Sequence, residues 1–349
     1  MTHRHNRFAP LRLALRGLGV VTMMVCGAAH AQEKLRVADA LPVGHYISEY
    51  ATKFWMQEVT RRTGGAVQFE YYPAEQLGKA KDLLSLAQSG VADVAYVATS
   101  YVSDKLPLSS VAELPGSFLT SCEGTLAYWK LAVGDGIIAK RDFEPNGVRV
   151  LFALSLPPYQ LLTAKRRFDS MPAAKGLKIR IPGGAALDAM VGGMKAVPVR
   201  VSSPELHETL SRGTIDGLLF PYSSTITYDL VSLLKYSTIG ENFGSAVIVY
   251  LISDARWKKL PPDMQKALAE AGDAATRRGC SMMDKDVDSD AAKLRKGGVE
   301  LVALQPAVHA ELVSLDAAVA QEWAESLDKR GKPGSEVLNA YRAALIPSR

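Results

Sequence analysis

Strand-like and helix-like patterns alternate along the first part of the chain. Residues 34–42 (KLRVADALP) and 66–73 (AVQFEYYP) are short, rich in β-branched or aromatic residues and end at a proline, which predicts two strands. Between them, residues 45–65 place apolar side chains at helical spacing, and two glycines end the pattern. A second helical pattern over residues 78–90 is followed by the apolar run 91–100. This order predicts a mostly parallel, doubly wound α/β sheet.

The same alternation returns from residue 147 to residue 221, which predicts a second α/β lobe. In this part, Ser203 is the predicted N-cap of a helix whose first residue is Pro204. Residues 260–298 and the tail beyond them are helical in pattern and long enough to brace both lobes. A mature chain of 318 residues also exceeds the usual span of one core, so two lobes are expected on length alone.

Residues 1–31 have the layout of a secretory signal peptide. Four arginines and no acid precede the apolar run GLGVVTMMVCGAA, and Ala29-His30-Ala31 forms an A-x-A cleavage site. The apolar run is too short for a spanning helix. Val25 stands before Cys26, where a lipoprotein signal needs a small residue. We therefore expect cleavage before Gln32 and an exported protein that is not embedded in a membrane.

Removal of the signal peptide changes the charge balance. The mature chain keeps 37 of the 41 basic residues and all 36 acidic residues, so the net charge falls from +5 to +1. A nucleic-acid partner would need a persistent basic face, which this balance does not support. The three remaining histidines are too scattered for a zinc site, and no metal or other cofactor is predicted. Cys122 and Cys280 could pair in an oxidising compartment, but their distance in space is left open.

The usual motifs of catalysis are absent from the sequence. HETLS starts like a metalloprotease helix, but no second histidine follows His207 at the required spacing. The chain has no G-x-S-x-G elbow, no P-loop and no G-x-G-x-x-G after a strand. These absences indicate a protein that is not an enzyme, although a secreted α/β hydrolase stays an alternative from another functional class.

Arg180 occupies an unusual place for a charged residue. It lies at the end of the apolar strand GLKIRIP and is followed by Pro182, two glycines and a predicted helix beginning near Ala185. In doubly wound sheets, ligands bind beyond the carboxyl ends of strands, near the N-termini of helices. A guanidinium matches a carboxylate with paired donors and does not lose its proton. The local pattern supports an anion site and a structural ion pair equally.

The residues now described resemble those of the solute-binding subunits of tripartite ATP-independent periplasmic (TRAP) transporters, a family typified by C4-dicarboxylate and sialic acid binding proteins. The segments that carry the resemblance are YYPAEQLG with LLSLAQSGVADVAY, LLTAKRRFDSMPAAKGLKIRIP, VPVRVSSPELHETLSRGTIDGLLFP and LISDARWKKLPPDMQKAL. The resemblance implies a two-lobed α/β binding protein of the Venus-flytrap type, with mixed sheets and long helices spanning both lobes. It implies a lobe I of residues 32–157 plus about 247–286, and a lobe II of residues 158–246 plus about 287–349.

The resemblance also implies a function. Arg180 matches the family arginine that clamps a ligand carboxylate, and the captured organic acid would pass to TRAP membrane permease subunits driven by an ion gradient. The protein would be a periplasmic monomer that performs no chemistry on its ligand. A role as a periplasmic sensor accessory needs the same closed cleft and stays open.

Departures from the family pattern narrow the expected ligand. Gln160 stands about where many relatives have a second cleft arginine, and Phe220 stands where they have an asparagine. These changes favour a monocarboxylate with an apolar or aromatic body, such as an aromatic, 2-oxo or 2-hydroxy acid, over the alternative of a C4-dicarboxylate. Each aromatic could equally serve core packing. The predicted ligand-binding residues are Arg180, Gln160, Tyr96, Phe220, Tyr222, Phe243, His45, Tyr46 and Ser203.

Overall fold

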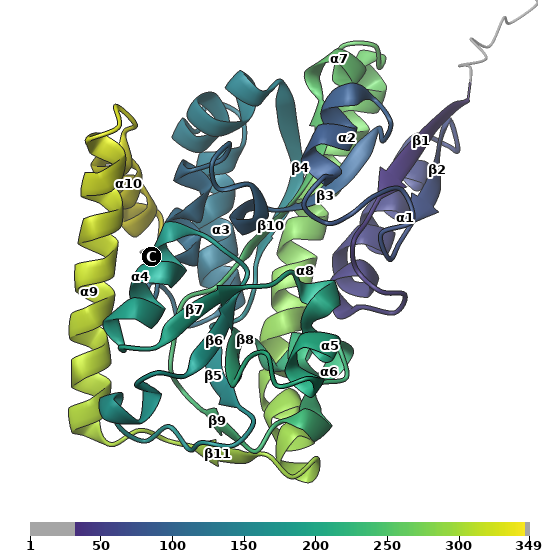
Figure 1. Cartoon of the computed structure of the whole chain (residues 1–349). Coiled ribbons are helices and arrows are strands. Elements are labelled where there is room, and N and C mark those ends of the chain that lie inside the picture. Colours follow the sequence, from purple (N-terminus) through teal and green to yellow (C-terminus); the bar gives the residue numbers. More distant parts are fainter. Residues whose placement is uncertain (1–31, 346–349) are drawn as a thin grey trace, which may run out of the picture. The chain divides into compact units, whose positions relative to one another are not determined.

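The computed structural model describes residues 32–345, so the predicted signal peptide lies outside the described residues. The described strands form two sheets (Figure 1). The first sheet has the strand order β2-β1-β3-β10-β4. Its strands are β1 (Glu33–Ala38), β2 (Val67–Tyr72), β3 (Val94–Ala98), β4 (Val148–Ser155) and β10 (Val247–Ser253).

The second sheet has the order β11-β9-β5-β8-β6-β7. Its strands are β5 (Gln160–Thr163), β6 (Lys178–Ile181), β7 (Val197–Arg200), β8 (Gly217–Phe220), β9 (Tyr236–Thr238) and β11 (Glu300–Val302). The chain enters this sheet after β4, returns to the first sheet for β10, and later adds β11 to the edge of the second. The connections between β4 and β5 and between β9 and β10 therefore join the two sheets.

The strands that the first alternation predicts, β1, β2 and β3, are parallel, but both sheets also contain antiparallel pairs, so the prediction of a mostly parallel sheet is wrong for the first sheet as a whole. In the first sheet, β1 pairs in parallel with β2 and β3, but β10 is antiparallel to both β3 and β4. In the second, β6 is parallel to β7 and β8, whereas β5 is antiparallel to β8 and β9. The local sequence pattern indicates where strands lie. It does not indicate whether a strand from a distant part of the chain, such as β10, pairs in parallel or antiparallel with its neighbours. The mixed sheets implied by the family resemblance are present.

Helices cover the sheets. The α-helices are α1 (Lys53–Arg62), α2 (Leu83–Ser89), α3 (Ser121–Ala132), α4 (Ala185–Gly193), α5 (Leu206–Ser211), α6 (Tyr222–Thr227), α7 (Asp254–Trp257), α8 (Pro262–Lys296), α9 (Pro306–Asp328) and α10 (Gly334–Leu345). Short 3₁₀ and π turns are η1 (Ser48–Thr52), η2 (Thr99–Val102), η3 (Leu108–Glu113), η4 (Ala139–Phe143), η5 (Glu144–Asn146), η6 (Met171–Ala174), η7 (Ser203–Glu205) and η8 (Val231–Leu233). The predicted helix over residues 45–65 therefore contains a π turn, η1, ahead of α1.

The predicted N-cap Ser203 is wrong by one residue. Ser202 is the N-cap of η7, and its hydroxyl and backbone N–H both donate to the Glu205 carboxylate. The Glu205 N–H in turn bonds to the Ser202 carbonyl oxygen. The helix begins with the 3₁₀ turn η7, which continues into α5. Its cap therefore lies one residue earlier, at Ser202, and the Ser203 side chain is available for other contacts.

Helix α8 connects the two sheets. It packs on β4 of the first sheet and, further along, on α6 and β11 beside the second sheet (Figure 1). At Gly272 the helix lies so close to β4 that an added Cβ would come within 1.8 Å of the Leu151 carbonyl oxygen. Glycine is therefore required for this approach of helix to strand.

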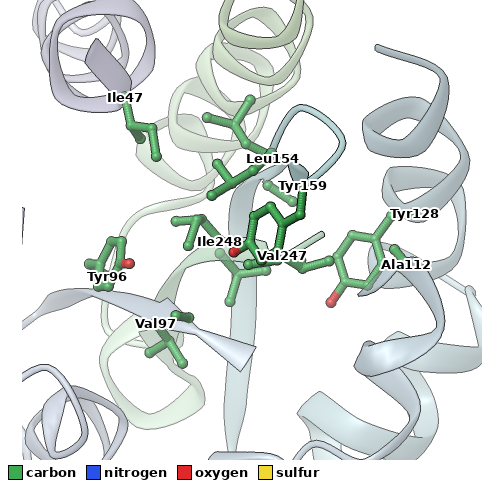
Figure 2. Close-up of a cluster of buried hydrophobic side chains, with 14 of the residues drawn as sticks. Ile47, Tyr96, Val97, Ala112, Tyr128, Leu154, Tyr159, Val247 and Ile248 are labelled. Carbon is green, nitrogen blue, oxygen red and sulfur yellow. The ribbon is translucent and has the colours of Figure 1, made fainter. Parts of the chain in front are cut away.

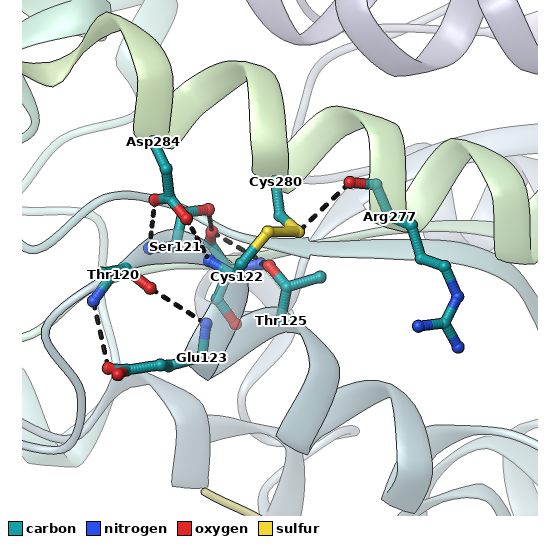
Figure 3. Close-up of a disulfide and its surroundings, with 9 residues drawn as sticks. Thr120, Ser121, Cys122, Glu123, Thr125, Arg277, Cys280 and Asp284 are labelled. Carbon is teal, nitrogen blue, oxygen red and sulfur yellow. Dashed lines mark hydrogen bonds between the residues drawn. A yellow bond between two sulfur atoms is a disulfide. The ribbon is translucent and has the colours of Figure 1, made fainter. Parts of the chain in front are cut away.

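A disulfide ties α3 to α8, which resolves the pairing that the sequence left open. Cys122 and Cys280 are bonded, with their Cα atoms 4.7 Å apart (Figure 3). The Asp284 carboxylate, one turn further along α8, accepts the backbone N–H groups of Ser121 at 2.7 Å and Cys122 at 3.0 Å. Free N–H groups of a helix N-terminus attract a carboxylate, so this hydrogen bonding reinforces the covalent link.

The buried apolar side chains form one cluster that extends through both sheets. Around β10, Tyr250 stacks on Phe152 at 4.3 Å between ring centroids, and Phe152 packs against Trp55 of α1 at 5.4 Å. Figure 2 shows another part of this cluster, where the Tyr96 and Tyr159 hydroxyls point toward each other with Ile248 between them. These two tyrosines also line the cavity described next.

Candidate ligand-binding site

A narrow cavity of about 20 Å³ has walls from both sheets. On the first-sheet side it is lined by Leu41, His45, Ile47, Tyr96, Ala98, Ser100, Tyr101, Leu156, Ala246 and Ile248. On the second-sheet side it is lined by Tyr159, Pro182, Ser203, Phe220, Ser224 and Tyr228. The walls are largely aromatic and aliphatic with a few polar atoms, as in small-molecule sites generally. The space between them holds only about one water molecule, so an organic acid enters only when the two walls separate.

Arg180 lies directly behind this wall and is fully buried. Strand β6 holds it between its parallel neighbours, opposite Val199 of β7 and Leu218 of β8. The Arg180 Cζ lies 4.9 Å from the centre of the Phe220 ring, and Phe220 lines the cavity. The guanidinium therefore sits at the boundary between the second sheet and the cavity.

The hydrogen bonds of Arg180 leave part of its donor capacity free. Its Nε–H donates to the Val201 carbonyl oxygen at 2.9 Å, Nη2 donates to Ser203 Oγ at 3.1 Å, and Nη1 makes a long contact of 3.5 Å with the Leu219 carbonyl oxygen. Two of its five N–H groups have no acceptor within residues 32–345, and no carboxylate of that range forms an ion pair with it. A buried charge is costly unless an opposite charge compensates it, so the arrangement suits an anionic ligand.

Ser203 connects Arg180 to the first-sheet side of the cavity. The Ser203 hydroxyl accepts a hydrogen bond from Arg180 and another, at 3.2 Å, from the Tyr101 hydroxyl. The Tyr101 oxygen also accepts the Ser203 backbone N–H at 2.8 Å. Since Tyr101 belongs to η2 and Ser203 to η7, these bonds cross the cavity and join its two walls.

Three further tyrosines form the aromatic part of the wall. Tyr96, Tyr159 and Tyr228 all line the cavity, and burial raises the pKa of each phenol well above its usual value. The phenols therefore stay protonated and neutral, so that they add apolar surface and O–H groups without adding charge.

His45 lines the cavity from the segment that follows β1. Its Nδ1 accepts the backbone N–H of Ile47 at 3.2 Å, and its ring stacks on Tyr46 at 4.4 Å. Burial lowers the pKa of His45 to about 3, so the imidazole is neutral. Tyr46 itself does not line the cavity; its hydroxyl bonds to Ser224 Oγ of the opposite wall at 2.9 Å.

Besides Tyr46, three more predicted residues do not line this cavity. Gln160 and Tyr222 line a separate groove of about 730 Å³. Gln160 Oε1 accepts a hydrogen bond from Thr238 Oγ1 at 2.9 Å, and the Tyr222 hydroxyl donates to the Thr238 carbonyl oxygen. Phe243 packs edge-on against Phe168, with ring centroids 5.9 Å apart. The structure thus brings Arg180, His45, Tyr96, Phe220 and Ser203 to the cavity but not these three.

Glu113 is a buried carboxyl beside the cavity that sequence reasoning missed. Its Oε1 accepts the Thr99 hydroxyl at 2.8 Å, and its Oε2 has no hydrogen-bond partner among the described residues. Burial raises the pKa of Glu113 to about 7. The loop after β6 meets the same region, because Gly183 (φ +140°) approaches the Ser100 carbonyl oxygen so closely that an added Cβ would lie 2.8 Å away. No sequence pattern marked Glu113, because its surroundings come from residues distant in the chain.

Neither a metal-binding cluster nor a membrane-spanning helix is found among the described residues. Residues 32–345 contain no group of three or more His, Cys, Asp or Glu side chains arranged to hold a metal ion. Among the helices of the same residues, none has the length and apolar character needed to cross a bilayer.

Comparisons with known proteins identify the family. Residues 37–328 match the model of the bacterial extracellular solute-binding proteins, family 7 (DctP). The outer membrane transporter protein TsaT of Comamonas testosteroni is 25% identical over 329 residues, which cover 92% of this chain and 95% of TsaT.

Solved structures share the fold. A TRAP solute-binding protein of an unidentified marine microbe, specific for aromatic acid ligands and in complex with metahydroxyphenylacetate, superposes with a TM-score of 0.82 at 22% identity, covering 90% of this chain and 98% of its own. A Bordetella bronchiseptica TRAP periplasmic solute-binding protein with bound mandelate gives a TM-score of 0.80 at 24% identity, covering 89% and 98%.

These neighbours confirm the two-lobed α/β fold of the Venus-flytrap type. The family and its structural neighbours are transport solute-binding proteins and not enzymes, so the hydrolase alternative is discarded. The chain belongs to the DctP family, family 7 of the bacterial extracellular solute-binding proteins, which includes the TRAP solute-binding proteins.

Proposed function

We propose that this protein captures a monocarboxylate with an aromatic or apolar body, clamping the ligand carboxylate with Arg180. The observation that carries the proposal is the buried guanidinium with two free N–H groups and no carboxylate partner among the described residues. A carboxylate would supply both the missing acceptors and the missing charge in a bidentate contact.

The cavity wall supports a single carboxylate over two. Apart from Arg180 behind it, the wall has no arginine or lysine among its described residues, and His45 is neutral. A C4-dicarboxylate would bury its second charge without a cation, which is unfavourable. The aromatic wall and the aromatic acids bound by the two structural neighbours favour an aromatic acid instead.

We further propose that the mature protein works in the periplasm as a monomer and delivers its ligand to a TRAP membrane permease. Membership of the family supports this role. Deletion of the gene should abolish uptake of the bound acid by intact cells and leave its metabolism in cell extracts unchanged. Loss of metabolism in the extracts, with uptake intact, would contradict a transport role.

Titration calorimetry tests the clamp. Arg180→Ala should weaken binding of an acid such as benzoate or mandelate at least about a hundredfold, because two charge-assisted hydrogen bonds are lost. Arg200→Ala is the matched control: Arg200 lies on the neighbouring strand β7, is exposed and pairs with Asp188, so its removal should leave affinity unchanged. The proposal fails if Arg180→Ala binds as the parent does, or if the parent binds succinate but no monocarboxylate.

A further inference from the structure

Two polar atoms of the cavity wall are fully shielded from solvent and have no hydrogen-bond partner among residues 32–345. They are His45 Nε2 and Ser100 Oγ, and both are buried. Native proteins pair nearly all buried polar groups, and an unpaired one costs free energy. Because both atoms belong to residues that face the same cavity, a bound molecule is the partner that they have in common.

The hydrogen bond made by His45 Nδ1 determines whether Nε2 of the same ring is a donor or an acceptor. Nδ1 uses its lone pair to accept the Ile47 N–H, so it carries no proton. The imidazole is neutral because burial lowers its pKa to about 3. A neutral ring with a bare Nδ1 carries its proton on Nε2. His45 thus presents an uncharged N–H donor, which can pair with a keto or hydroxyl oxygen but brings no positive charge to balance a second buried carboxylate.

The packing around His45 holds this donor in place before a ligand arrives. The Tyr46 ring stacks on one face of the imidazole at 4.4 Å, and the Tyr228 ring meets it edge-on at 5.5 Å. The Tyr46 hydroxyl is bonded to Ser224 of the opposite wall. A side chain fixed in this way loses little further freedom on binding, which favours selective contact.

His45 and Arg180 approach the cavity from different sheets. His45 follows β1 of the first sheet, whereas Arg180 belongs to β6 of the second. Ser100 lies in η2, directly after β3, where the loop after β6 meets its carbonyl oxygen. His45 therefore faces a ligand from the first-sheet side of the cavity, opposite the side from which Arg180 reaches the ligand carboxylate.

We propose, resting on the proposed function, that His45 and Ser100 select acids that carry an uncharged oxygen acceptor in addition to the carboxylate, such as a keto or hydroxyl oxygen. The His45 Nε2–H donates to this oxygen, and the Ser100 hydroxyl adds a second contact. Simple aromatic acids that lack such an oxygen bind more weakly because the two polar atoms then stay unpaired.

Three acids with one carboxylate each test the selection by titration calorimetry: phenylacetate, phenylglyoxylate with a keto oxygen, and 3-hydroxyphenylacetate with a ring hydroxyl. The parent should bind at least one of the two oxygenated acids about tenfold or more tighter than phenylacetate. His45→Leu should lower the affinity for the preferred oxygenated acid about tenfold more than the affinity for phenylacetate, so that the preference disappears. His45→Gln, which restores an N–H donor, should recover part of the preference, and Ser100→Ala should reduce it.

Direct observation of the imidazole avoids dependence on a variant that folds poorly. The mature chain has only three histidines, so ¹⁵N-labelled histidine gives few signals. The preferred oxygenated acid should shift the His45 Nε2–H resonance downfield, phenylacetate should shift it less, and His207 and His309 serve as internal references.

The outcomes separate the two proposals. Equal affinity of the parent for all three acids, or an equal loss for all three in His45→Leu with no selective shift of the imidazole signal, overturns the role of His45 and leaves the carboxylate clamp intact. If the parent binds none of the acids, or Arg180→Ala binds them all as the parent does, the proposed function fails and the role of His45 fails with it.

Discussion

At the scale of the single residue, the unexpected group is the buried Glu113 carboxyl. Burial raises its pKa from 4.5 to about 7, so the folded state holds a proton that the unfolded state has released between these pH values. Stability contributed by the protonated form is therefore present below about pH 4.5 and is lost as the pH rises to about 7. Replacing Glu113 with Gln, which does not ionise, should remove this loss.

We expect Glu113→Gln to unfold at the same denaturant concentration as the parent near pH 4 and to be more stable at pH 8, by about 1–3 kcal/mol. Urea titrations over this pH range measure the difference between variant and parent. Burial also raises the pKa of Asp142 to about 6 and that of Asp316 to about 7. Because both aspartates are present in variant and parent, the difference in stability between the two proteins isolates the contribution of Glu113. A difference that stays constant with pH would show that Glu113 does not titrate in this window.

At the scale of the element, the contact of α8 with β4 depends on Gly272. A methyl group there would lie 1.8 Å from the Leu151 carbonyl oxygen, which is backbone and cannot rotate away. Gly272→Ala should lower the free energy of unfolding by about 1–3 kcal/mol or more, measured by urea denaturation. Gly192→Ala in α4 is the control, since nothing lies within 4 Å of its added Cβ and alanine favours a helix. Equal effects of the two changes would refute the close-approach argument.

At the scale of the whole molecule, the Cys122–Cys280 disulfide closes a loop of 158 residues between α3 and α8. Cross-links over long loops restrict the unfolded chain, and their removal typically costs about 2–5 kcal/mol. The double replacement Cys122→Ser, Cys280→Ser should lower the midpoint of urea unfolding by an amount that corresponds to this loss of free energy. Reduction of the parent should lower its unfolding midpoint to a similar extent. The double variant itself should not respond to reductant. A parent whose midpoint is unchanged by reduction would contradict a stabilising role.

Part of the fold and of the site follows from local patterns. The strand that carries Arg180, the helix that begins at Ala185 and the helix stop at Gly90 are where the sequence predicts them. Such patterns arise from side-chain periodicity and turn chemistry within a few residues. Arg180 stands out in the sequence because it is a charged residue within an otherwise apolar, β-branched strand pattern.

The rest required the tertiary structure. Tyr101, Tyr159 and Tyr228 line the cavity although no local feature separates them from core aromatics, and Gln160 and Tyr222 bond to Thr238 away from it. By itself, the sequence determined many of the strands and helices, though not β9, β10 or β11, and which arginine breaks the apolar pattern, because these depend on neighbours in the chain. Only the tertiary structure decided the insertion of β10, the cysteine pairing and the members of the cavity wall, because these depend on contacts between residues far apart in the chain.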